Sequence, residues 1–79
     1  MTNEEMMSRL YKRMTAEQQK YKAWLLEQPP NVILDNACKF TVREDIVMEM
    51  EVLELTDAQA AALLRSRTPL ADVYRAWER

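Results

Sequence analysis

The 79-residue sequence contains no glycine. Glycine adopts positive φ more easily than any other residue, so it is favoured in β-hairpin turns and in phosphate-binding loops. A P-loop and a Rossmann fingerprint both need glycines at fixed positions, and the sequence therefore excludes both motifs. β-Hairpins also lose their favoured turn residues. Histidine is absent as well, which removes imidazole as a general base or zinc ligand.

The composition predicts one folded domain over residues 1–79. Hydrophobic residues make up 48% of the chain and charged residues 30%, as in an ordinary globular protein. The apolar runs "VIL" and "AAALL" are far shorter than the roughly 20 residues needed to span a bilayer. Glu4 and Glu5 near the start argue against a signal peptide, and the single cysteine, Cys38, cannot form an internal disulfide. We therefore expect a cytoplasmic protein.

Threonine residues mark the expected helix starts. In a capping box, a threonine hydroxyl accepts from the amide three residues later, and a Glu or Gln there bonds back to the cap. The threonines with such a partner are Thr2 with Glu5, Thr15 with Gln18, Thr41 with Glu44, and Thr56 with Gln59. Thr68 is instead followed by Pro69, and proline is favoured at the first helical position.

The first predicted helix runs from about Asn3 to Glu27. Its apolar stripe consists of Met7, Leu10, Met14, Tyr21 and Trp24, with Glu17 as an interruption. Because this stripe passes straight through Thr15, we prefer one long helix with Thr15 on its outer face. A break at Thr15 into two short helices is the alternative. Pro29 and Pro30 end the helix, because the residue before a proline is displaced from the α conformation.

Apolar residues at helical spacing continue after Pro30. They are Ile33, Ala37, Phe40, Val42, Ile46, Met50 and Leu53, and they fit either two helices at an angle or one kinked helix. A short alanine-rich helix follows over Ala58 to Ser66, and the last helix runs from Pro69 to Trp77. The predicted fold is an all-α compact bundle of four to five helices. It has a long N-terminal helix and a C-terminal αα-hairpin with Trp77 in the core.

The last two predicted helices have the outline of a DNA-binding helix-turn-helix. The basic residues that would contact DNA are Arg65, Arg67, Arg75 and Arg79. However, Pro69 and Leu70 stand where base-reading side chains would be needed, and neither can hydrogen-bond a base edge. The net charge of −2 also opposes phosphate binding. We therefore favour a plain αα-hairpin, with a small DNA-binding regulator as the alternative.

Acidic residues are concentrated in the middle of the chain. The candidates for a protein-binding face are Glu44, Asp45, Glu49, Glu51 and Glu54. Glu44 and Asp45 have a structural explanation too, because acidic groups stabilise the first turn of a helix. The face is either simply solvated or a docking surface for a basic partner protein, including one that normally holds nucleic acid. Such a surface would steer association in a salt-sensitive way.

The same side chains give little support for catalysis or metal binding. The acidic spacing lacks the loop ligands and central glycine of an EF-hand. Cys38 has no histidine to activate it, and its place beside Leu34 and Val42 on a predicted helix fits core packing. We therefore expect no catalytic residue, no metal site and no cofactor.

The first turns of the long helix carry more apolar surface than a small bundle needs. Met6, Met7, Leu10 and Tyr11 nearly surround the helix there. Either the bundle wraps this end or a partner covers it, and a second copy of the chain would make the protein a dimerisation module.

Three segments resemble a family of short helical domains of unknown function encoded on mobile elements of gut anaerobic bacteria. They are "EQxxYxxWL" in the first helix, "TVRED" from Thr41 to Asp45, and "PLxDV" from Pro69 to Val73, within a similarity that covers Leu10 to about Trp77. The resemblance implies no enzymatic activity. It implies a context in which small acidic helical proteins block restriction or CRISPR systems, or regulate the element's genes. We therefore expect a non-enzymatic protein-binding module with a mobile-element accessory or counter-defence role.

Overall fold

The computed structural model describes residues 1–78 and contains four helices. They are α1 (Asn3–Leu26), α2 (Pro30–Glu49), α3 (Asp57–Arg65) and α4 (Pro69–Glu78). The described residues include no strand. The all-α class and the single long N-terminal helix are confirmed. The middle region forms one helix, α2, so the bundle has four helices, and Leu53 lies beyond its end.

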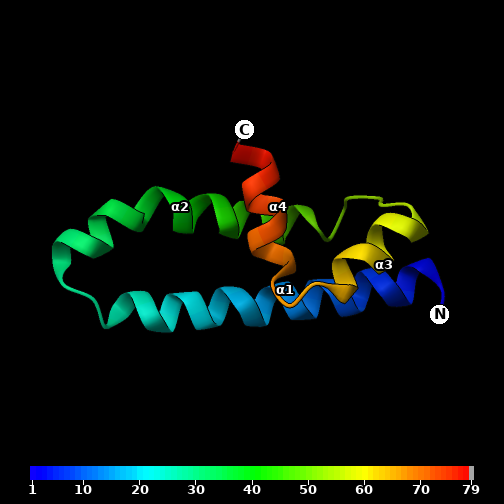
Figure 1. Cartoon of the computed structure of the whole chain (residues 1–79), viewed down its shortest axis with the longest axis horizontal. Coiled ribbons are helices and arrows are strands. Elements are labelled where there is room, and N and C mark those ends of the chain that lie inside the picture. Colours follow the sequence, from blue (N-terminus) through cyan, green and yellow to red (C-terminus); the bar gives the residue numbers. More distant parts are fainter. Residues whose placement is uncertain (79) are drawn as a thin grey trace.

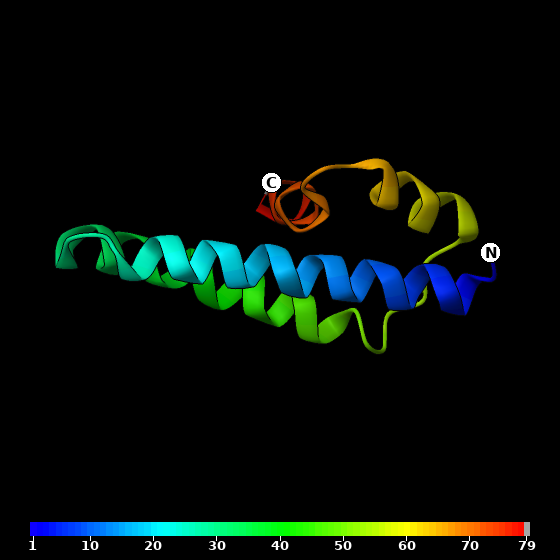
Figure 2. The same ribbon diagram turned by 90° about the horizontal axis from the view of Figure 1, so that it is seen from below.

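The helices form two layers (Figures 1 and 2). The first layer is the antiparallel pair α1 and α2, and α3 and α4 lie together on one face of it. α3 runs along the first half of α1, whereas α4 begins on α1 and crosses α2 (Figure 1). α4 is steeply inclined to α3 (Figure 1), so the two C-terminal helices form an angled pair. Its angle follows from α4 packing across both α1 and α2.

Two of the four predicted capping boxes are present. Thr2 and Thr56 each accept from the amide three residues later, and Glu5 and Gln59 bond back to the caps. Thr41 lies inside α2 instead, and its hydroxyl donates to the Ala37 carbonyl at 3.0 Å. Thr15 lies inside α1 with its hydroxyl oxygen buried, so it does not occupy the outer face. At both positions the apolar stripe holds the backbone helical, and the box cannot form.

The described chain needs no glycine because no residue in it has positive φ. Pro29 precedes α2 in an extended conformation, with φ −61° and ψ 155°. Ser66 ends α3 in a similar conformation, with φ −76° and ψ 146°. Prolines begin both α2 and α4. At Pro29 and Ser66 the turns therefore pass through extended conformations with negative φ, which any L-amino acid can adopt.

The core lies where the second layer covers the first. Its buried members are Leu10, Met14, Ile46, Val47, Met50 and Leu70. The α1–α2 end of the molecule projects beyond α4 (Figure 1), so Cys38 and Leu34 are exposed and the prediction that they pack in the core is wrong. Trp77 is 64% exposed because α4 continues past α2, which corrects the prediction of a core tryptophan.

Candidate functional site

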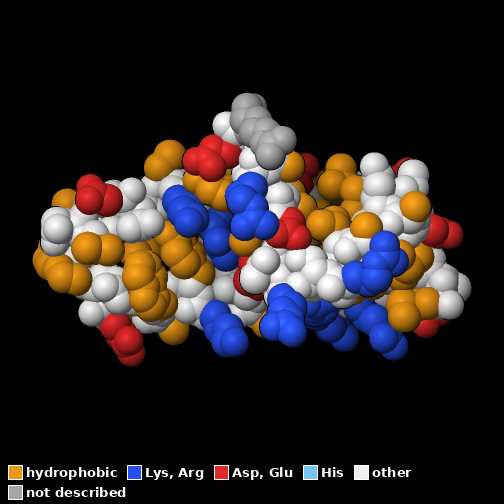
Figure 3. Space-filling view, viewed as in Figure 1, with side chains coloured by type: hydrophobic (Ala, Val, Ile, Leu, Met, Phe, Trp, Pro, Cys, Tyr) orange, Lys and Arg blue, Asp and Glu red, His pale blue; other side chains and the backbone are white. Residues whose placement is uncertain are grey.

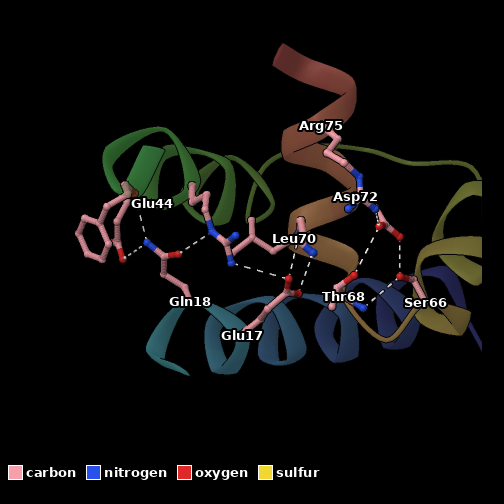
Figure 4. Close-up of polar contacts among 11 residues, drawn as sticks. Glu17, Gln18, Glu44, Ser66, Thr68, Leu70, Asp72 and Arg75 are labelled. Atoms are coloured by element: carbon pink, nitrogen blue, oxygen red, sulfur yellow. Dashed lines mark hydrogen bonds and ion pairs between the residues drawn. The ribbon is translucent and has the colours of Figure 1, made fainter. Parts of the chain in front are cut away.

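A buried polar network fixes α4 to the first layer (Figure 4). Both carboxylate oxygens of Glu17, on α1, accept from the start of α4, one from the Leu70 amide and one from the Ala71 amide, each at 2.9 Å. The Arg43 guanidinium, on α2, lies 3.7 Å from the same carboxylate. Glu17 thus supplies from another helix the negative charge that stabilises a helix N-terminus. This role explains why an acidic residue interrupts the apolar stripe of α1.

Gln18 extends this network toward α2. Its side-chain amide donates to the Phe40 carbonyl at 3.2 Å and to Glu44 at 3.1 Å, and its oxygen accepts from Arg43 Nε at 3.2 Å. The guanidinium also lies over the Tyr21 ring, 4.5 Å from its centroid. The buried polar groups of Gln18 and Arg43 therefore have hydrogen-bond partners, which offset the cost of withdrawing them from water.

The connection from α2 to α3 is anchored to the start of α1. Asn3 donates through its side-chain amide to the Leu55 carbonyl at 2.9 Å and to the Asp57 carboxylate at 2.8 Å. Before that anchor, the Leu53 amide bonds to the Glu49 carbonyl at 2.8 Å, so the chain continues as a turn after α2. The connection therefore has a defined path beside α1.

An open groove of about 680 Å³ lies between this connection and the first turns of α1. Its lining residues are Asn3, Glu4, Met7, Ser8, Tyr11, Met50, Glu51, Val52, Leu53, Glu54 and Leu55. We call it the acidic groove, because the lining combines three carboxylates with apolar side chains and includes no basic residue. Val52 is 76% exposed and Leu53 46% exposed.

The five predicted acidic residues do not share one helix face, which corrects that part of the prediction. Asp45 and Glu49 are exposed on α2, whereas Glu51 and Glu54 lie in the connection and line the acidic groove. Glu44 is half-buried and accepts from Gln18, so it serves the interior. The physical reason is that α2 ends at Glu49, so Glu51 and Glu54 lie beyond the helix and cannot continue its face.

The acidic groove brings together the acidic residues that follow α2 and the apolar residues at the start of α1, which are far apart in the sequence. Of the apolar residues at the start of α1, Met6 and Leu10 are buried, whereas Met7 and Tyr11 line the groove. Glu4 was missed as a site residue because its place in the first turn already had a capping explanation. Its spacing to Met7 and Tyr11, which share one helix face with it, was the available signal.

The groove carboxylates perturb the nearby phenol. The pKa of Tyr11 is raised from its ordinary value of 10.0, first through the hydrogen bond of its side chain with Glu51 and then through the negative charge of that carboxylate. Both effects disfavour the phenolate. Tyr11 and Glu51 both line the acidic groove, so the raised pKa of the phenol accords with their common place in it.

The residues predicted for DNA binding are dispersed. Arg65 and Arg67 are exposed on either side of the α3–α4 corner, and Arg75 pairs with Asp72 on α4. Arg79 lies outside the described residues. Pro69 and Leu70 are buried against α1, so the first turn of α4 is not presented as the base-reading end of a recognition helix.

The fold and the groove define a small all-α protein with an acidic surface site. Over residues 6–79 the chain matches the family described as "Protein of unknown function (DUF3848)", and it belongs to that family. No curated protein and no solved structure matches the chain. None of the described helices is both long enough and apolar enough to cross a membrane.

Proposed function

We propose that this protein is a non-enzymatic module that binds a basic segment of a partner protein in the acidic groove. The observation that carries the proposal is the composition of the groove. Glu4, Glu51 and Glu54 surround exposed apolar side chains, and no lysine or arginine lines the site. The partner chemistry that fits is an apolar anchor flanked by lysines or arginines.

The arrangement resembles the anatomy of protein interfaces. Binding energy in such interfaces concentrates on a few apolar anchors, and a surrounding polar rim excludes water and selects the partner. Val52 and Leu53 are the exposed anchors, and Met48 is a further exposed apolar side chain on α2 nearby in sequence. Asp45 and Glu49, one turn earlier on α2, extend the negative charge beyond the groove. Long-range attraction would therefore raise the association rate, and rim charges would set the salt dependence.

The proposed biological role is that of a mobile-element accessory or counter-defence factor. Nucleases and other proteins that hold nucleic acid neutralise its phosphates with lysine and arginine side chains. An acidic module seated on these side chains would compete with the nucleic acid for the same positive charges. Nothing in this role requires chemistry on a substrate, and we assign no catalytic residue.

The test uses a labelled peptide of alternating arginine and leucine. A peptide of alternating glutamate and leucine is the control of opposite charge. Fluorescence anisotropy should show that the natural protein binds the arginine peptide more tightly, with affinity falling as salt rises. Reversing both connection carboxylates, Glu51→Lys with Glu54→Lys, should weaken binding by about tenfold, equivalent to about 1.4 kcal/mol. Circular dichroism should show the same helix content, because both side chains are exposed.

The matched control is Glu27→Lys with Asp35→Lys, which changes the net charge equally at exposed sites at the other end of the molecule. It should retain binding. Equal losses in both variants would mean that only net charge matters, and the groove would be rejected as the site. A natural protein that does not distinguish the two peptides would also reject it. Self-association at low salt that disappears in the groove variant would identify the partner as a second copy.

A further inference from the structure

Basic residues gather on the edge of the molecule formed by α1 and the α3–α4 corner. Figure 3 shows lysine and arginine side chains along the lower edge, beneath these elements. Arg9, Lys12 and Lys20 are exposed on α1, and Arg65 and Arg67 are exposed at the corner. We call this surface the basic edge and include the half-buried Arg13 in it. The charge counts of the sequence obscured it, because acidic residues elsewhere in the first third balance these residues numerically.

Arg13 brings the two parts of the basic edge together. Its guanidinium donates to the Leu64 carbonyl and to the Ser66 carbonyl, each at 2.5 Å, and so anchors the end of α3 on α1. Arg65 and Arg67 flank Ser66 in the chain, and this anchor places them beside the positive side chains of α1. The residues form one surface although more than 50 positions separate Arg13 from Ser66.

No carboxylate forms an ion pair with the basic edge within residues 1–78. Asp72 accepts from the Ser66 hydroxyl at the α3–α4 corner and pairs with Arg75, and Glu5 precedes Arg9 by one turn of α1. Glu17 is the one acidic residue between Arg9 and Lys22, and it is turned inward to Arg43 and the start of α4. The ion pairs found among residues 1–78 join Arg43 to Glu17 and Arg75 to Asp72, so neither uses the basic edge. A hollow of about 420 Å³ also lies among Arg9, Lys12 and Arg13, with Met1 and Leu64 as its apolar walls.

The net charge of −2 does not cancel this local field. The shorter extents of the molecule are 24 Å and 20 Å, whereas charges are screened over a Debye length of about 8 Å at physiological salt. Asp45 and Glu49 lie on α2, in the other half of the first layer, whereas the carboxylates of the acidic groove lie beside the first turns of α1, near the Arg9 end of the basic edge. An anion beside Lys12 and Lys20 therefore experiences mainly the positive side chains around it.

We propose that the basic edge binds the phosphate backbone of duplex nucleic acid without reading its sequence. Arg9 and Lys20 are eleven residues apart on a straight helix, which corresponds to about 16 Å and so to roughly five base-pair steps of 3.4 Å. The members of the edge are lysines and arginines, which suit phosphate groups. The site is distinct from the helix-turn-helix arrangement, because α4 contributes no side chain to it.

The test measures binding of a short fluorescein-labelled DNA duplex by the full chain over a range of salt concentrations. The natural protein should bind at low salt, and log K should fall with log salt at a slope of roughly −3 to −5, as expected for several phosphate contacts. Replacing Arg9, Lys12 and Lys20 by glutamine should weaken binding at least tenfold and reduce the slope by about three. Arg13 is left unchanged because it holds α3.

The matched control replaces Lys22, Lys39 and Arg75 by glutamine and thus reaches the same net charge. It should keep the affinity and slope of the natural protein. Absence of salt-dependent binding, or equal losses in the two variants, would overturn the proposal. Tighter binding of poly-glutamate than of the duplex would overturn it too, because the occupant would then be an acidic protein surface. Because the groove variant at Glu51 and Glu54 should bind DNA normally, the two proposed sites fail or succeed separately.

Discussion

Replacement of Glu17 by alanine tests how α4 is held in place. The side chain of Glu17 is 15% exposed and that of Arg43 7% exposed, so both charges are largely withdrawn from water. Alanine would remove the two acceptors of the Leu70 and Ala71 amides and leave the Arg43 guanidinium without its counter-ion. The substitution should therefore destabilise the fold far more than loss of an exposed carboxylate.

The magnitude follows from two costs. Loss of a helix cap costs about 1 kcal/mol, and leaving one partner of a buried ion pair alone costs about 3–5 kcal/mol. Arg43 keeps its bond to Gln18 and its contact with the Tyr21 ring, so we expect a total of about 3–4 kcal/mol. A chain of this length has a free energy of unfolding of roughly 4–12 kcal/mol, so the loss is a large fraction.

Urea unfolding followed by circular dichroism measures the effect. With an m-value of about 1–1.5 kcal/mol per M, the midpoint should fall by roughly 2–4 M. Adding Arg43→Met to Glu17→Ala should recover part of the loss, because it removes the unpaired charge. Asp35→Ala, at an exposed position of α2, should change the free energy of unfolding by less than about 0.5 kcal/mol. A loss below about 1 kcal/mol for Glu17→Ala, or no recovery in the double variant, would refute the reasoning.

The pKa values of Tyr11, Tyr21 and Tyr74 are raised above 10.0 in the folded protein, so the unfolded chain loses these protons first as the pH rises. The contribution of these tyrosines to the free energy of unfolding should therefore be complete below about pH 10 and fall above it. Urea midpoints across that range should show the fall, and Glu51→Gln should make it smaller by lowering the pKa of Tyr11. Exposed Cys38 should react with a thiol reagent in the native protein at nearly its rate in the unfolded chain, and strong protection would show that this end is covered in solution.

The helix content was predictable because it depends on local signals. Thr2 and Thr56 have their capping partners three residues away, and Pro29 and Pro30 stop α1 whatever the tertiary structure. Thr41 has the same local pattern but lies inside α2, because the apolar residues on both sides of it pack best in a continuous helix. Local capping signals therefore identify possible starts, and packing decides which are used.

The sites were only partly predictable because they join distant segments. Glu51 and Glu54 were identified from their clustering, but their grouping with Glu4 depends on how the connection lies beside α1. The functions of Glu17 and Arg13 were missed because their partners are backbone groups more than 50 positions away. No pattern in a single helix indicates which of its charged residues will turn inward.

α1 contacts each of the other three helices, whereas α3 does not contact α2. This dependence has a consequence for a nascent chain on the ribosome. α1 and α2 are neighbours in sequence and are able to pair early, but Glu17 must wait for Leu70 before its carboxylate is satisfied. Until then, the core around Leu10 and Met14 lacks Leu70 and the side chains of α3 that pack against it, and we expect chaperones to recognise that surface on the growing polypeptide.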